Sequence, residues 1–241
     1  ISANSVVRGA DGSIVLKASG GVQLDAGSVV SRNGSSGGRI VVDAQKGDAA
    51  VSGTLSASGS EQAGGSIAVT GSRVGLFDAA LVDASGANGG GTVLLGGDAH
   101  GAAIRDGEQA LPNSQRTFVA ANVQIRADAS ATGDGGKVVV WADDATQFYG
   151  TISARGGARG GNGGFVETSG KGWLDFQGRV DARAPAGSAG TLLLDPTNIT
   201  IGVTANTPTM AFGGCGDNTY CDTATTPSNL NVGTLTGQLG S

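Results

Sequence analysis

Apolar residues recur along this chain at fixed distances after short turns of small residues. We take the second small residue of each turn as an anchor, usually the second glycine of a Gly-Gly pair. The anchors are Gly12, Gly38, Gly65, Gly91, Gly136, Gly164 and Gly190. Successive anchors lie 26, 27, 26, 45, 28 and 26 residues apart. A period this regular predicts a solenoid of stacked coils.

The residues after each anchor predict the faces of a strand. Two positions after the anchors stand Ile14, Ile40, Ile67, Val93, Val138, Val166 and Leu192. Four positions after them stand Leu16, Val42, Val69, Leu95, Val140, Thr168 and Leu194. Side chains two apart in a strand share a face, so stacked coils would align these residues in two inward columns.

Two further strands are predicted in each coil. Before each turn, a larger residue is followed two positions later by a small one; the larger residues are Val29, Leu55, Val82, Ala129, Ile152 and Val180. A third strand between the two patterns is predicted at 22–24, 49–51, 74–77, 147–149 and 173–176. Three strands per coil of about 26 residues predict an all-β parallel β-helix. We expect the turn glycines to supply both positive φ angles and close backbone approach.

The spacing of 45 residues equals one coil plus about 18 more, which predicts a single insertion. We place it at about 97–118, with a helical turn within 99–109. It gathers His100, Arg105, Asp106, Glu108 and Arg116. Loops on rigid scaffolds often carry function, so the insertion is either a binding element or a solvated excursion.

The β-helix is predicted to span residues 1–203, because Asp195-Pro196 interrupts the repeat and proline cannot donate to a central ladder. Residues 204–241 are predicted to form an irregular cap or the start of another region. Cys215 and Cys221 lie there; they form either a disulfide-closed loop, which indicates an oxidising compartment, or two free thiols.

Composition narrows the function. The 241 residues include 45 glycines and only 4% aromatics, so small and β-branched side chains must fill a narrow core. The net charge of −5 argues against binding to a nucleic-acid backbone. No apolar run approaches the roughly 20 residues of a membrane-spanning helix.

The sequence gives little support for catalysis. Acidic residues are scattered over different strands, His100 is the only histidine, and no phosphate-binding loop occurs. Two cysteines with one histidine do not make a zinc site. We therefore expect a protein that is not an enzyme and that needs no cofactor or metal.

One candidate binding surface follows from the register. Trp141 falls five positions after its anchor, on the outward face beside Val139. An exposed indole beside apolar neighbours can stack on a sugar ring, but the insertion or the tail could also fold over it. Trp173 alternates oppositely to Leu174 and is expected to face outward as well. Tyr149 is a further candidate.

Two strings in the last third resemble a known family. GGFVETSG (163–170) and AGTLLLDPTNITI (189–201) are similar to segments of the large exported adhesins of Gram-negative two-partner secretion, which include filamentous-haemagglutinin-like and high-molecular-weight adhesins. The resemblance is specific over about 137–201 and generic over 13–96. It implies a right-handed β-helix, an N-terminal or near-N-terminal position in a longer chain, export through an Omp85-type outer-membrane transporter, and a secreted or cell-surface location.

Two functional hypotheses remain, with a β-helical polysaccharide-degrading enzyme as a weaker third. In the first, implied by the resemblance, the chain is part of an adhesin, including the biofilm-matrix type. It then binds an exopolysaccharide or a host glycan through the outward aromatic residues and the insertion. In the second, the chain is a structural stalk or a secretion segment without a ligand of its own.

Overall fold

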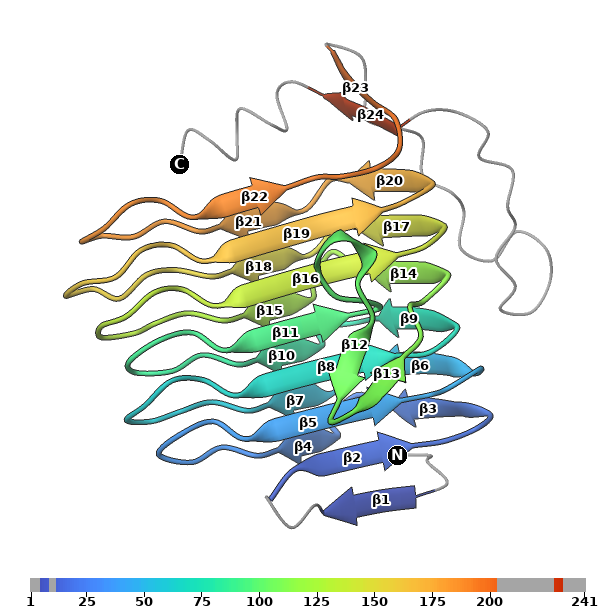
Figure 1. Cartoon of the computed structure of the whole chain (residues 1–241), viewed down its shortest axis with the longest axis horizontal. Coiled ribbons are helices and arrows are strands. Elements are labelled where there is room, and N and C mark those ends of the chain that lie inside the picture. Colours follow the sequence, from blue (N-terminus) through green and yellow to red (C-terminus); the bar gives the residue numbers. More distant parts are fainter. Residues whose placement is uncertain (1–4, 9–11, 203–227, 232–241) are drawn as a thin grey trace.

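The chain folds as a β-solenoid of about seven coils with three parallel sheets running along its length (Figure 1). The computed structural model describes residues 5–8, 12–202 and 228–231. The first sheet contains, in spatial order, β1 (Ser5–Arg8), β2 (Ile14–Lys17), β5 (Arg39–Asp43), β8 (Ser66–Thr70), β11 (Thr92–Leu95), β16 (Lys137–Ala142), β19 (Phe165–Gly170) and β22 (Thr191–Leu193). All neighbours in this sheet are parallel except β1, which pairs antiparallel with β2.

The other two sheets complete each coil. The second sheet contains β3 (Gly21–Leu24), β6 (Asp48–Val51), β9 (Arg73–Leu76), β14 (Arg116–Val119), β17 (Ala145–Phe148) and β20 (Trp173–Phe176). The third contains β4 (Val29–Ser31), β7 (Thr54–Ser56), β10 (Leu81–Asp83), β15 (Gln124–Arg126), β18 (Thr151–Ser153) and β21 (Arg179–Asp181). The predicted all-β parallel β-helix is confirmed.

The predicted inward columns are confirmed residue by residue. Ile14 pairs in register with Ile40, and the column continues through the successive anchor-plus-two residues to Leu192. The anchor-plus-four residues align in the same way from Leu16 to Thr168. Stacking like residues buries a continuous apolar core, in which the rings of Phe148 and Phe176 stack 5.6 Å apart.

The anchor glycines are needed for close approach. A Cβ on Gly65 would lie less than 3.0 Å from the backbone of Gly38, and each later anchor would meet the preceding one in the same way up to Gly190. Among the anchors only Gly12 has a positive φ, of 77°. The expectation of positive φ is therefore confirmed at the turn glycines Gly89, Gly133, Gly160 and Gly161 but does not hold at the later anchors. The expectation of close approach is confirmed.

Two assignments within the coils need correction. Val29 is 63% exposed and Val30 takes the inward place, because it is Val30 that pairs with Leu55. In the coil that carries the insertion, Ile125 rather than Ala129 continues this column. In strands of three residues, alternation alone does not fix which residue points inward.

The sequence repeat did not predict the strand β14, because most of it falls within the range that the sequence assigned to the insertion. Arg116 and Phe118, placed within the insertion by the sequence, belong to β14 and pair with β9 and β17. The extra chain therefore consists of about residues 96–115, between β11 and β14, and we call this segment the insertion below.

At the C-terminal end, β23 (Ile199–Gly202) pairs with β24 (Ser228–Asn231), and Leu230 belongs to the main core cluster. Cys215 and Cys221 lie outside the described residues.

Candidate functional site

The insertion forms a tight 3-10 turn followed by a short β-hairpin. The turn is η1 (Ala99–Gly101), capped by the Asp98 side chain, and we call it the apex of the insertion. The chain then continues into β12 (Ile104–Asp106) and β13 (Gln109–Leu111), which pair antiparallel. The helical turn expected within 99–109 is limited to η1. His100 has a left-handed φ of 55°, which is uncommon for a residue other than glycine.

The hairpin packs on an apolar outward stripe of the first sheet. Ile104 and Leu111 are 2% and 1% exposed and form a second hydrophobic cluster with Val41 and Ala68. In Figure 1, β12 and β13 lie in front of β5 and β8. This contact explains why a solenoid can carry apolar side chains on its outer face: the insertion removes them from water.

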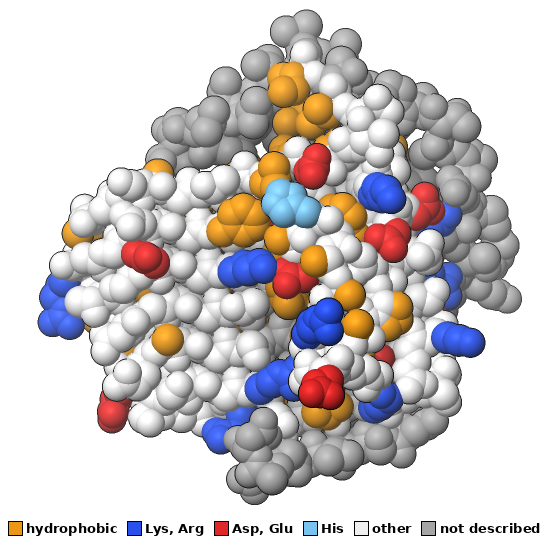
Figure 2. Space-filling view, viewed as in Figure 1, with side chains coloured by type: hydrophobic (Ala, Val, Ile, Leu, Met, Phe, Trp, Pro, Cys, Tyr) orange, Lys and Arg blue, Asp and Glu red, His pale blue; other side chains and the backbone are white. Residues whose placement is uncertain are grey.

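Polar contacts fix the hairpin over this stripe. Arg39 pairs with Asp106, Lys137 pairs with Asp98, and the Thr70 hydroxyl donates to the Pro112 carbonyl over 2.7 Å. Figure 2 shows side chains of both charge signs interspersed around the insertion. The insertion is therefore held by ion pairs at its rim and by apolar packing beneath it.

A buried carboxylate lies under the apex. Glu167 is fully buried, and its two oxygens accept from the backbone N–H of His100 at 3.2 and 3.1 Å. Glu167 occupies the outward column between Val139 and Leu193. Because a buried carboxylate is costly without a donor, this contact ties the apex to the neighbouring coil.

Trp141 is covered by the insertion, which is the second of the two alternatives that the sequence left open. The side chain is 4% exposed and Val139 is fully buried. A Cβ at Gly97 or Gly101 would lie 2.7 and 2.6 Å from the indole ring, so these glycines let the backbone pack directly on it. The indole Nε1 donates to Asp143 Oδ1 over 2.9 Å.

The remaining predicted site residues are dispersed. Arg105 and Glu108 are exposed at the end of the hairpin that lies away from the apex. Arg116, in β14 of the second sheet, pairs with Asp144. Trp173 lies on the face opposite Leu174, as expected, yet it is only 4% exposed. Of the nine candidates, the structure brings only His100 and Trp141 together in one pocket.

Tyr149 belongs to a polar cluster on the second sheet. Its hydroxyl donates to Asp175 over 2.7 Å and accepts from Gln147 over 3.0 Å. Burial raises the pKa of Asp175, although the hydrogen bonds from Tyr149 and Gln177 oppose that shift. Burial, together with the hydrogen bond to Asp175 and its charge, raises the pKa of Tyr149, so the phenol stays neutral.

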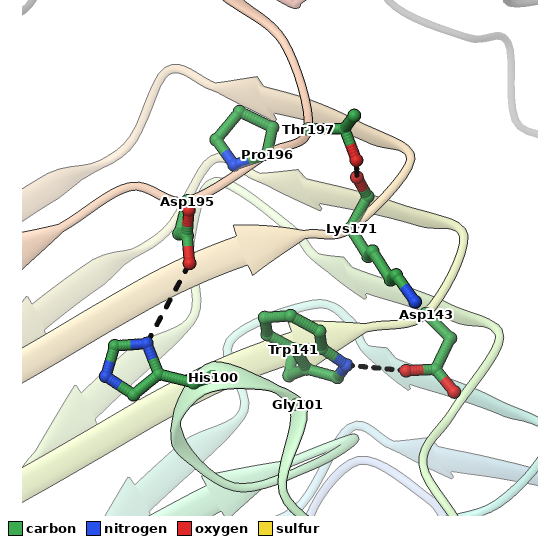
Figure 3. A pocket seen from close by; sticks show the side chains of 8 residues that line it. All are labelled: His100, Gly101, Trp141, Asp143, Lys171, Asp195, Pro196 and Thr197. Atoms are coloured by element: carbon green, nitrogen blue, oxygen red, sulfur yellow. Dashed lines mark hydrogen bonds and ion pairs between the residues drawn. The ribbon is translucent and has the colours of Figure 1, made fainter.

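The pocket lies beside the apex of the insertion (Figure 3) and has a volume of about 390 Å³. It is lined by His100, Gly101, Trp141, Asp143, Lys171, Asp195, Pro196 and Thr197. His100 Nδ1 lies 3.8 Å from Asp195 Oδ2 across its mouth. The described residues contain no group of three or more His, Cys, Asp or Glu side chains placed to hold a metal ion.

The sequence contained a signal for the residues that were missed. Trp141, Ser169 and Asp195 each stand five positions after an anchor, whereas Asp143, Lys171 and Thr197 each stand seven positions after one. The inward columns were counted to four positions after each anchor. Counting on to seven positions predicts that these two sets of residues form neighbouring columns at the end of the first sheet. The fold of the insertion over them could not be read from the repeat.

Comparison with known proteins follows the fold. No protein-family model and no curated protein matches the sequence. In the part of the chain that the structure describes, no helix is long and apolar enough to cross a membrane. Among solved structures, the chain is similar to the HMW1 secretion domain from Haemophilus influenzae, with 30% sequence identity and a TM-score of 0.53. The similarity covers 75% of this chain and 44% of the length of that chain, and it supports a relationship of the two-partner-secretion type.

Proposed function

We propose that this chain is a secretion segment of a large exported protein of the two-partner type, which leaves the cell through an Omp85-type outer-membrane transporter. The observation that supports this most is the 30% identity to a secretion domain across three quarters of the chain. That neighbour is a secretion domain and not an enzyme.

The coil architecture suits this role. Each coil contacts chiefly its neighbours, so a chain that emerges progressively can add one coil at a time to those already folded. The antiparallel strand β1 covers the edge of β2, whereas the last strand β22 pairs on one side only among the described residues.

Adhesion by the exported protein is a second proposal. The indole of Trp141 is covered and no longer provides an exposed stacking surface. The pocket beside the apex is the observation that favours a ligand on this segment.

The test of the secretion role is an in-frame deletion in the natural exported protein. Removal of residues 39–181 should abolish its appearance in the culture medium, while the transporter is still produced. A smaller deletion of residues 97–113, which leaves every coil intact, should preserve export. Unchanged export after the large deletion would refute the proposal.

A further inference from the structure

We propose that the outer face of the third sheet, toward its C-terminal end, binds the headgroups of an anionic phospholipid membrane. The face belongs to three neighbouring strands, β15, β18 and β21, on successive coils (Figure 1). The inward residues of these strands, Ile125, Ile152 and Val180, are buried in the core. The outward side chains, which we call the arginine face, are Gln124, Arg126, Asp128, Thr151, Ser153, Arg155, Arg179, Asp181 and Arg183. This inference does not rest on the proposed secretion role.

Positive charge is concentrated in this part of the sheet. The arginine face carries four arginines and two aspartates, a net charge of +2, in a chain whose net charge is −5. The corresponding outward positions on and after β4, β7 and β10 carry one charged side chain, Asp83. At about 0.1 M salt, exposed charges more than about 10 Å apart are largely screened. A partner that touches the arginine face therefore meets its local positive charge rather than the net charge of the chain.

The four arginines are exposed, and two of them share an acid on the face itself. Arg183 Nη2 lies 2.7 Å from Asp181 Oδ2, and Arg155 Nε lies 3.6 Å from the same oxygen. Arg126 donates to the neutral Gln124 side chain, and neither Arg126 nor Arg179 makes an ion pair with the described residues. Asp181 therefore orients two of the guanidinium groups, while Arg126 and Arg179 keep their full charge for a partner.

The shape and chemistry of the arginine face favour a membrane over a peptide as the partner. The strands stack in register, so their side chains project from one flat surface in rows about 4.8 Å apart. None of the outward side chains is apolar, whereas protein interfaces depend on large side chains buried in well-packed pockets. Guanidinium groups bind phosphate oxygens bidentately, and basic clusters attract anionic lipid headgroups. A planar array of lipid phosphates supplies complementary charge without needing an apolar anchor.

The experiment sediments the purified chain with vesicles of phosphatidylcholine, with and without phosphatidylglycerol, at low and physiological salt. Poly-glutamate serves as a soluble polyanion that stands for an acidic protein. The loss variant is the double substitution Arg126→Gln and Arg179→Gln. The gain variant is Thr151→Lys, at an exposed position that pairs in register with Gln124 and Arg179.

The matched control for the loss variant is the double substitution Lys46→Gln and Arg105→Gln. It removes the same two charges from exposed positions outside the third sheet. Circular dichroism confirms that each variant remains folded.

We expect the chain to sediment with vesicles that contain phosphatidylglycerol and not with pure phosphatidylcholine, and to do so less at higher salt. A basic side chain near an anionic surface contributes about fivefold in affinity. The loss variant should therefore bind about 25-fold more weakly and the gain variant about fivefold more tightly, while the control should bind like the wild type.

Four results would overturn the proposal. The wild type could fail to bind the anionic vesicles, or the control could lose as much affinity as the loss variant, which would assign the effect to net charge alone. The gain variant could bind no more tightly than the wild type. The chain could also bind poly-glutamate in preference to the anionic vesicles, which would assign the arginine face to an acidic protein instead.

Discussion

Replacement of Gly65 by alanine tests the stacking of the coils. The Cβ of Gly65→Ala would lie less than 3.0 Å from the backbone of Gly38, and no side-chain rotation can relieve that contact. The Gly38 carbonyl accepts from the N–H of Ser66 over 2.9 Å, so separating the two turns also breaks a ladder hydrogen bond.

The magnitude follows from these two losses. Overpacking costs about 1–3 kcal/mol, and a buried carbonyl without its donor costs about 1–3 kcal/mol. Against this, alanine reduces the conformational entropy of the unfolded chain and recovers about 0.4–1 kcal/mol. We expect Gly65→Ala to lower the free energy of unfolding by about 1–6 kcal/mol.

The assay is urea unfolding followed by far-ultraviolet circular dichroism, with Gly20→Ala as the matched control. Gly20 has no atom within 4 Å of the position of an added Cβ, and its φ lies outside the left-handed region. The control should be as stable as the wild type or slightly more stable. If Gly65→Ala unfolds at the wild-type urea concentration, or if both variants lose equal stability, the account of the anchors is wrong.

Three further predictions concern the insertion and the second sheet. Leu111→Ala should cost about 2–5 kcal/mol of local packing, which should speed hydrogen exchange in the insertion with little change in melting temperature. Gln109→Ala, at an exposed position of the same hairpin, should leave hydrogen exchange in the insertion unchanged. Glu167→Ala should speed proteolysis at the apex because the His100 N–H loses its buried acceptor, and Glu167→Gln, which keeps an oxygen there, should not; equal rates would contradict the assigned contact. Asp175→Asn should stabilise the fold at pH 7. Because the pKa of Asp175 is raised in the folded state, its protonated form contributes to folding stability below the ordinary pKa of 3.8, and this contribution is lost as the pH rises through the folded value. At pH 7 the buried carboxylate is charged, and asparagine removes that charge. That advantage should disappear in unfolding curves measured below about pH 4, and an advantage independent of pH would refute the assignment.

The repeat made the solenoid predictable because the same physical requirement recurs in every coil. Seven anchors mark the same turn, and five of them, from Gly65 to Gly190, make the same close approach to the preceding anchor, so an error at one of them does not shift the others. The third sheet was less certain because its strands have only three residues, and Val29 and Val30 satisfy the alternation equally well. The site was only partly predictable: His100 and Trp141 were recognised, but the cover over Trp141 depends on Ile104 and Leu111, whose partners lie on other coils.

The most direct test of the central claim is export of a reporter. A periplasmic β-lactamase is fused after this chain behind a signal peptide and produced with the cognate Omp85-type transporter in a Gram-negative host. The account predicts transporter-dependent β-lactamase activity in the medium, and none when the chain is omitted from the fusion. Retention of the folded fusion in the periplasm, while the transporter still exports its natural substrate, would contradict it.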